Sequence, residues 1–199
     1  VYATVRNTLH SEGLWQEIDA FTRELQATET MDSIKQQTAI VATRDPYRAC
    51  GKDPSRYRPS AEALRRRLLR GLDLYQIDTL VDLINLVSLR TGYSIGGFDA
   101  DKIQGTDLCL GIGKADEEFE GIGRGPLNIE GLPVYRDAIG GIGTPTSDHE
   151  RTKMGIETTH ILALINGYSG EKGLQEAAEM TLDMLKKYAD ATEGEIVLY

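Results

Sequence analysis

The stretch from Thr79 to Asp99 constrains the fold most, because it is the densest apolar run of the chain. Apolar residues recur there at the spacing of one helix face: Leu80, Leu83, Ile84 and Val87. Further apolar side chains fall on the other sides of the same helix. The pattern therefore predicts a helix that is buried nearly all round and forms the spine of the fold.

Three polar residues, Asp82, Asn85 and Ser88, interrupt this helix at intervals of three and form one slanting row. Buried polar groups need hydrogen-bond partners. One interpretation is that the row ties neighbouring loops to the core. The other is that Asn85 belongs to a pocket.

Length and composition indicate one domain, since 199 residues with 40% apolar content suffice for a core without metal or disulfide support. We expect a core over residues 40–168, preceded by an extension (1–39) and followed by a C-terminal segment (169–199). Runs of helices around short strands predict an α+β fold with mixed or antiparallel sheets. At the ends of the chain we expect strands over Tyr2–Arg6 and Ile196–Tyr199.

The cysteines, Cys50 and Cys109, are far apart and form no CxxC pair, which is typical of a reducing compartment and speaks against a zinc knuckle. The sequence has no run of 18 apolar residues and no signal-peptide pattern. We therefore expect a cytoplasmic protein with no membrane partner, no metal and no cofactor. The sequence begins with Val1 rather than methionine, so a preceding segment is left open, as is the oligomeric state.

Positive charge is concentrated in one segment, although the whole chain carries a net charge of -9. Residues 44–70 contain nine basic residues against three acidic ones, a balance of +6, so the rest of the chain carries -15. Such a distribution favours one anion-attracting face. Within it we predict an RNA-binding set: Lys52, Arg56, Arg58, Arg65 and Arg66.

Tyr47 and Tyr57 lie between these basic residues, and aromatic rings beside guanidinium groups suit stacking on unpaired bases. The alternative is that Arg56 and Arg58 pair with Asp53 and with distant acids as structural clamps. The sequence leaves both interpretations open.

The spine helix and the segment after it carry a specific resemblance. A VDxxN helix, a glycine turn, a Phe-Asp dipeptide and then Asp101-Lys-Ile103 resemble the tRNA-binding and editing domain of the phenylalanyl-tRNA synthetase β chain. Val134-Tyr-Arg-Asp137 and the glycine turn at 140–143 resemble a later strand and loop of that domain. GKDPSRYRPS and Asp148-His-Glu-Arg-Thr152 are similar to free-standing relatives. The resemblance covers roughly residues 40–168.

The resemblance implies a pocket that hydrolyses a wrongly attached amino acid from tRNA. The family's asparagine falls on Asn85, its histidine on Gly96 and its glutamate on or beside Leu164, so the last two groups are absent here. The expected pocket set is Asn85, Gly96, Gly97, Phe98, Gly140, Gly141 and Gly143. We expect Asn85, Asp99 and the turn at 140–143 to line one common cleft.

Replacements for the two absent groups would have to be other acids or imidazoles: Asp82, Asp99, Asp148, His149 or Glu150. Consecutive residues such as Asp148, His149 and Glu150 do not readily converge on one metal ion. The first hypothesis is therefore an editing-domain relative that binds tRNA or aminoacyl-tRNA ends and deacylates misacylated tRNA. The alternative is a non-catalytic module that binds tRNA or a small amino-acid-like ligand. Because the sequence has no ATP-binding motif, we expect no aminoacylation by this chain alone.

Overall fold

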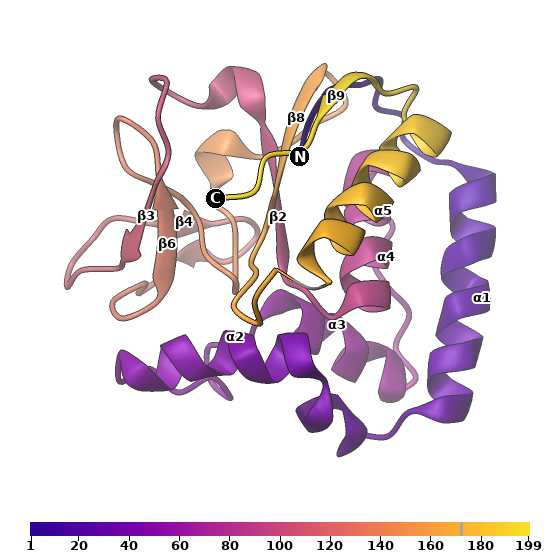
Figure 1. Cartoon of the computed structure of the whole chain (residues 1–199), viewed down its shortest axis with the longest axis horizontal. Helices are drawn as coiled ribbons and strands as arrows, with labels where there is room; N and C mark the ends of the chain where they lie inside the picture. Colours follow the sequence, from indigo (N-terminus) through magenta and orange to yellow (C-terminus); the bar gives the residue numbers. More distant parts are fainter. Residues whose placement is uncertain (172) are drawn as a thin grey trace.

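The computed structural model describes residues 1–171 and 173–199. The described residues form five α-helices: α1 (Glu12–Thr28), α2 (Thr38–Ala49), α3 (Ser60–Leu69), α4 (Thr79–Thr91) and α5 (Leu174–Tyr188). Figure 1 shows α1 as an outer layer and α4 and α5 between it and a central sheet, with α2 and α3 at one end. The α+β class predicted from the sequence is confirmed.

The central sheet has four antiparallel strands in the order β2-β8-β1-β9. Its strands are β1 (Tyr2–Thr4), β2 (Ile95–Asp99), β8 (His160–Ile165) and β9 (Thr192–Glu195). Both ends of the chain thus join the same sheet as its middle. The predicted first strand is confirmed over Tyr2–Thr4. The expected last strand is misplaced, because β9 ends before Ile196.

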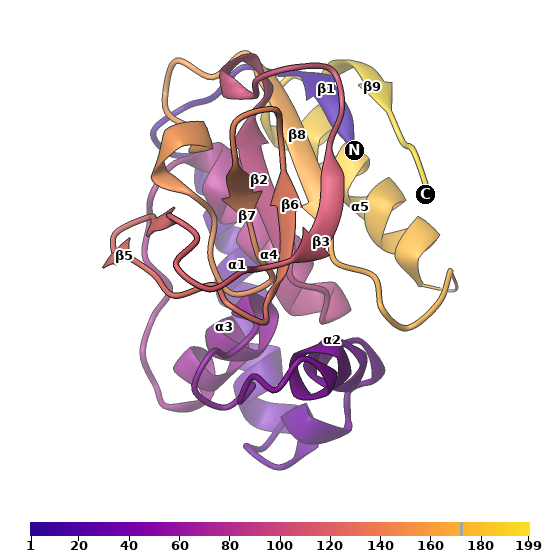
Figure 2. The same ribbon diagram turned by 90° about the vertical axis from the view of Figure 1, so that its left-hand side faces the viewer.

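A second sheet, of order β3-β6-β7, packs against the other face of the central sheet (Figure 2). Its strands are β3 (Cys109–Ile112), β6 (Pro133–Arg136) and β7 (Gly141–Gly143). The remaining short elements are β4 (Glu120–Gly121), β5 (Gly125–Pro126) and three 3-10 turns, η1 (Ser33–Gln36), η2 (Ala100–Lys102) and η3 (Glu150–Thr152).

Helix α4 is the buried spine that its sequence predicted. The Asp78 side chain accepts a hydrogen bond from the Val81 N–H (2.9 Å) at its start. Gly92 ends the helix with φ 79°, a left-handed conformation that glycine adopts without strain. Between these caps the buried residues are Thr79, Leu80, Asp82, Leu83, Ile84, Leu86, Val87, Ser88 and Leu89.

Asp82, the first residue of the polar row of α4, ties neighbouring segments to the core. Its carboxylate accepts hydrogen bonds from the Trp15 indole N–H (2.8 Å) and the Ile77 backbone N–H (3.1 Å). Burial raises the pKa of Asp82, and these two hydrogen bonds work against that rise. Asp82 therefore holds α1 and the loop before α4 in place.

Candidate functional site

The two glycines of β2, Gly96 and Gly97, face opposite sides of the central sheet. A Cβ on Gly97 would lie 2.7 Å from Ile84 Cδ1 of α4, whereas one on Gly96 would lie 2.9 Å from Asp148 Oδ1. Successive residues of a strand point to opposite faces. Gly97 thus faces the helical layer, and Gly96 faces the second sheet.

The prediction that Asn85 and the glycine turn at 140–143 line one common cleft is wrong. Asn85 is half-buried on α4, on the helical side of the central sheet, while β7 with Gly141 and Gly143 lies on the other side (Figures 1 and 2). A Cβ on Gly143 would lie 2.8 Å from Asp148 Oδ1 and 2.5 Å from Phe98 Cζ. The match to the family pattern aligned these residues along the chain, but it could not predict on which face of the central sheet each would lie.

Asp148 is the candidate acid that reaches the absent histidine position. Its Oδ1 lies between Gly96 and Gly143, and its Oδ2 accepts a hydrogen bond from the Gly97 N–H (3.2 Å). Burial raises the pKa of Asp148 to about 7, with the hydrogen bond from Gly97 acting in the opposite direction. A carboxyl group with this pKa exchanges a proton near neutral pH.

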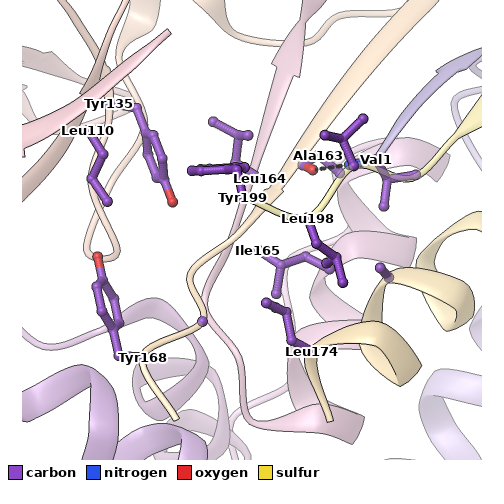
Figure 3. Close-up of a pocket in the computed structure, with 13 residues that line it drawn as sticks. Val1, Leu110, Tyr135, Ala163, Leu164, Ile165, Tyr168, Leu174, Leu198 and Tyr199 are labelled. Atoms are coloured by element: carbon purple, nitrogen blue, oxygen red, sulfur yellow. Dashed lines mark hydrogen bonds between the residues drawn. The ribbon is translucent and has the colours of Figure 1, made fainter. Parts of the chain in front are cut away.

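A cavity of about 120 Å³ lies beside β8, and its lining comes from the second sheet, from α5 and from the two ends of the chain. Its lining is Val1, Leu110, Tyr135, Ala163, Leu164, Ile165, Gly167, Tyr168, Leu174, Ala178, Val197, Leu198 and Tyr199 (Figure 3). Leu164 is the strand partner of Gly96, and Tyr135 is the strand partner of Gly143. The pocket and the Asp148 cluster are therefore neighbours, although Asp148 is not part of the lining.

The pocket is mainly apolar, but it contains one unsatisfied polar atom. In Figure 3 the Tyr168 side chain points its hydroxyl toward Leu110 and Tyr135. This hydroxyl is buried and has no hydrogen-bond partner among the described residues. Since buried polar atoms are nearly always paired, it marks a place for a ligand or water atom. No sequence signal identified Tyr135 or Tyr168.

The other acid and imidazole candidates do not converge on this pocket. Asp99 accepts hydrogen bonds from Thr158 Oγ1 (2.9 Å) and from the Asp101 N–H (3.1 Å), so it caps η2 and anchors a loop. His149 accepts a hydrogen bond from the Arg151 N–H (2.9 Å), and burial lowers its pKa. Glu150 pairs with Lys153. These residues have structural partners of their own.

The glycine turn at 140–143 is held by Asp137. Its carboxylate accepts hydrogen bonds from the Ile139 and Gly140 N–H groups (3.1 and 3.2 Å) and pairs with Arg151 (2.8 Å). Although burial opposes ionisation, Arg151 and the backbone N–H groups of Gln104 and Ile139 lower the pKa of Asp137 to about 2. The turn is thus fixed by an ionised aspartate.

The predicted RNA-binding set divides into an exposed part and a buried part. Arg65 is 3% exposed and pairs with Glu29 and the Leu89 carbonyl, so it does not lie on the surface. Arg66 and Arg58 lie close to Glu62, a fully buried carboxylate. The clamp interpretation therefore holds for part of the set, with Glu62 rather than Asp53 as the partner of Arg58.

The prediction that Tyr47 stacks on unpaired bases is wrong. Its side chain is 0% exposed, and its hydroxyl is hydrogen-bonded with Thr146 (2.7 Å). Tyr57 is half-buried, and Lys52 Nζ lies 4.1 Å from its ring centroid. Arg56 is exposed beside the same ring, at 5.7 Å. Lys52 and Arg56 remain the surface cations of this loop.

The described residues contain no group of three or more His, Cys, Asp or Glu side chains placed to hold a metal ion. None of the helices in the described ranges has the length and apolar character needed to cross a bilayer.

Comparisons with known proteins identify the family of this chain and a structural neighbour. The family model of the B3/4 domain matches residues 42–190. A solved structure of an N-terminal fragment of the phenylalanyl-tRNA synthetase β subunit from Pyrococcus horikoshii superposes with a TM-score of 0.50 at 18% identity. That similarity covers 57% of this chain and 40% of the fragment. Comparison with curated proteins finds no significant match. The chain belongs to the B3/4 domain family, a synthetase-related domain found in the phenylalanyl-tRNA synthetase β chain.

Proposed function

We propose that this protein binds the aminoacyl end of a tRNA and holds the amino-acid side chain in the pocket beside β8 (Figure 3). The observation that carries the proposal is the buried Tyr168 hydroxyl, which has no partner among the described residues and which a polar ligand atom would satisfy. An otherwise apolar lining suits the rest of a side chain.

The size of the cavity supports a small ligand group. Ordinary ligand pockets enclose roughly 300–1,000 Å³, and this cavity has about 120 Å³. It therefore suits one side chain rather than a whole cofactor. Family membership supports an amino acid carried by tRNA as this ligand. We also propose that the protein acts in the cytoplasm with charged tRNA as its partner.

Among the described residues, those that line the pocket include no acid and no imidazole side chain, which favours binding over hydrolysis. Aminoacyl-tRNA deacylation is the second candidate, because Asp148 lies next to the pocket with a pKa of about 7. A carboxyl group with that pKa could act as a general base or acid on a water molecule near neutral pH. Its place outside the lining makes deacylation the weaker candidate.

The test compares binding of charged and uncharged tRNA by filter retention. Charged tRNA should bind more tightly, and Tyr168→Phe should remove roughly three- to tenfold of that advantage while leaving binding of uncharged tRNA unchanged. Tyr75→Phe is the matched control, because Tyr75 is 68% exposed and lies outside the pocket lining. Equal binding of charged and uncharged tRNA would contradict the proposal.

The same preparations decide between the candidates in a deacylation assay on a panel of misacylated tRNAs. Binding without hydrolysis supports the module. Hydrolysis above the rate without protein that is abolished in a folded Asp148→Asn variant would instead establish the deacylase.

A further inference from the structure

Three arginines surround one buried carboxylate at the junction of α2, α3 and the loop between them. Glu62 is 0% exposed, and it pairs with Arg44 (2.8 Å) and Arg66 (2.8 Å). Arg58 Nε lies 3.7 Å from the same carboxylate, beyond hydrogen-bond distance. We call Arg44, Arg58, Arg66 and Glu62 the arginine cluster.

The arginine cluster carries more positive than negative charge. One carboxylate balances one of three guanidinium groups, so two positive charges remain. Burial lowers the pKa of Arg58, Glu62 raises it, and the cations Arg66, Arg70 and Arg44 lower it again. Among the described residues, Glu62 is thus the acid that acts on Arg58.

Arg58 also has donors to spare. Its Nε is buried and has no hydrogen-bond partner among the described residues. The side chain as a whole is 31% exposed, against 12% for Arg44 and Arg66, so Arg58 forms the accessible side of the cluster. Arg44 Nη2 donates to Ser55 Oγ (3.2 Å), which fixes the neighbouring loop against the cluster. A fixed group of forked donors with surplus charge is suited to an anion.

We propose that the arginine cluster is a binding site for a phosphate monoester, reached through Arg58. A phosphate monoester carries about 1.5 to 2 negative charges at neutral pH, which matches the two uncompensated charges. A carboxylate or a phosphodiester brings one charge and leaves the cluster unbalanced. Free mononucleotides and the 5′-phosphate of an RNA share this chemistry. The RNA source rests on the proposed function, because a tRNA presents its 5′ end beside its aminoacyl end.

The experiment measures binding by calorimetry at constant ionic strength, with inorganic phosphate, AMP and adenosine as probes. Phosphate and AMP should bind and adenosine should not. Arg58→Ala should weaken AMP binding about tenfold or more, since hydrogen bonds to charged groups are the strong ones. Arg58→Lys should lose less, because it keeps the charge without the fork. Arg48→Ala is the control: Arg48 is exposed and pairs with Asp45.

Thermal unfolding establishes that each variant is folded, and Arg58→Lys keeps the test decisive if Arg58→Ala does not fold. Equal binding of AMP and adenosine would overturn the proposal. So would equal AMP affinity of the Arg48→Ala protein and folded Arg58 variants.

A second arm separates the two phosphate sources with one tRNA carrying either a 5′-phosphate or a 5′-hydroxyl. Tighter binding of the 5′-phosphate form, lost in the Arg58 variant, supports the RNA source. Equal binding of both forms, with AMP binding intact, overturns that source and supports free phosphate esters. If no tRNA binds, the proposed function fails, and the AMP result alone decides whether the site exists.

Discussion

Replacing Asp148 by asparagine should raise the stability of the protein relative to the wild type by more at pH 8 than at pH 5, because only the wild type loses stability as this group titrates. Burial between Gly96 and Gly143 raises the pKa of Asp148 from 3.8 to about 7. The folded protein therefore keeps a proton on this carboxyl group where the unfolded chain has released it. This linkage stabilises the fold at low pH, and the stabilisation is lost as the pH rises toward 7.

The size of the effect follows from the pKa difference. Each unit between the folded and unfolded values corresponds to about 1.4 kcal/mol. Between pH 5 and pH 8 the folded carboxyl ionises across about two units, so the wild type should lose about 3 kcal/mol from this group. An asparagine amide does not titrate, and its oxygen can still accept the hydrogen bond from the Gly97 N–H.

Urea denaturation of both proteins at pH 5, 6, 7 and 8 measures this difference. The stability of the variant relative to the wild type should be about 3 kcal/mol higher at pH 8 than at pH 5. Asp183→Asn is the control, because the Asp183 side chain is 78% exposed. If the Asp148→Asn protein follows the pH dependence of the wild type, or is less stable at every pH, the account of a buried, protonated Asp148 is refuted.

Three further substitutions test contacts that hold the fold together, each by chemical denaturation against the wild type. Glu62→Gln should cost about 3–5 kcal/mol, because it leaves partly buried arginines without a counter-charge; a loss below about 1 kcal/mol would contradict this. Trp15→Phe should cost about 1–3 kcal/mol by removing the indole donor to buried Asp82, and an unchanged midpoint would exclude that role. Gly143→Ala should cost about 1–3 kcal/mol, because its methyl group would lie 2.5 Å from a Phe98 ring carbon; wild-type stability would show that the sheets can separate there.

The sequence identified Asp148 and the glycine turn at 140–143 as candidate site elements, and their role stays a prediction. The positions of the absent histidine and glutamate, Gly96 and Leu164, are direct partners on adjacent strands. Matching distant segments to one family pattern thus pointed to residues that lie side by side in the fold. The same pattern placed Asn85 there wrongly, because the face of a helix is not contained in the order of residues along the chain.

The basic segment, residues 44–70, shows that charge can be read from the sequence although solvent exposure cannot. Its charge is readable from the sequence, but exposure is not, and Arg65 and Tyr47 are among the most buried side chains of their helices. A count of nine basic residues therefore overstates the cationic surface, since one carboxylate 18 residues from Arg44 draws several of them inward. The burial of Glu62 and Arg65 in the packed structure is what distinguishes structural clamps from surface cations.

The sequence by itself determined the elements whose causes are local. The apolar spacing of α4 predicted this buried helix, and its Asp78 cap and the glycine at its end also act within the same stretch of chain. The tertiary structure alone decided which side chains share a pocket. It also decided that Asp148 is buried away from water and that Arg44 and Arg66 pair with Glu62. These properties depend on burial and on electrostatic interactions among residues far apart in the chain, and both exist only once the sheets and helices have packed.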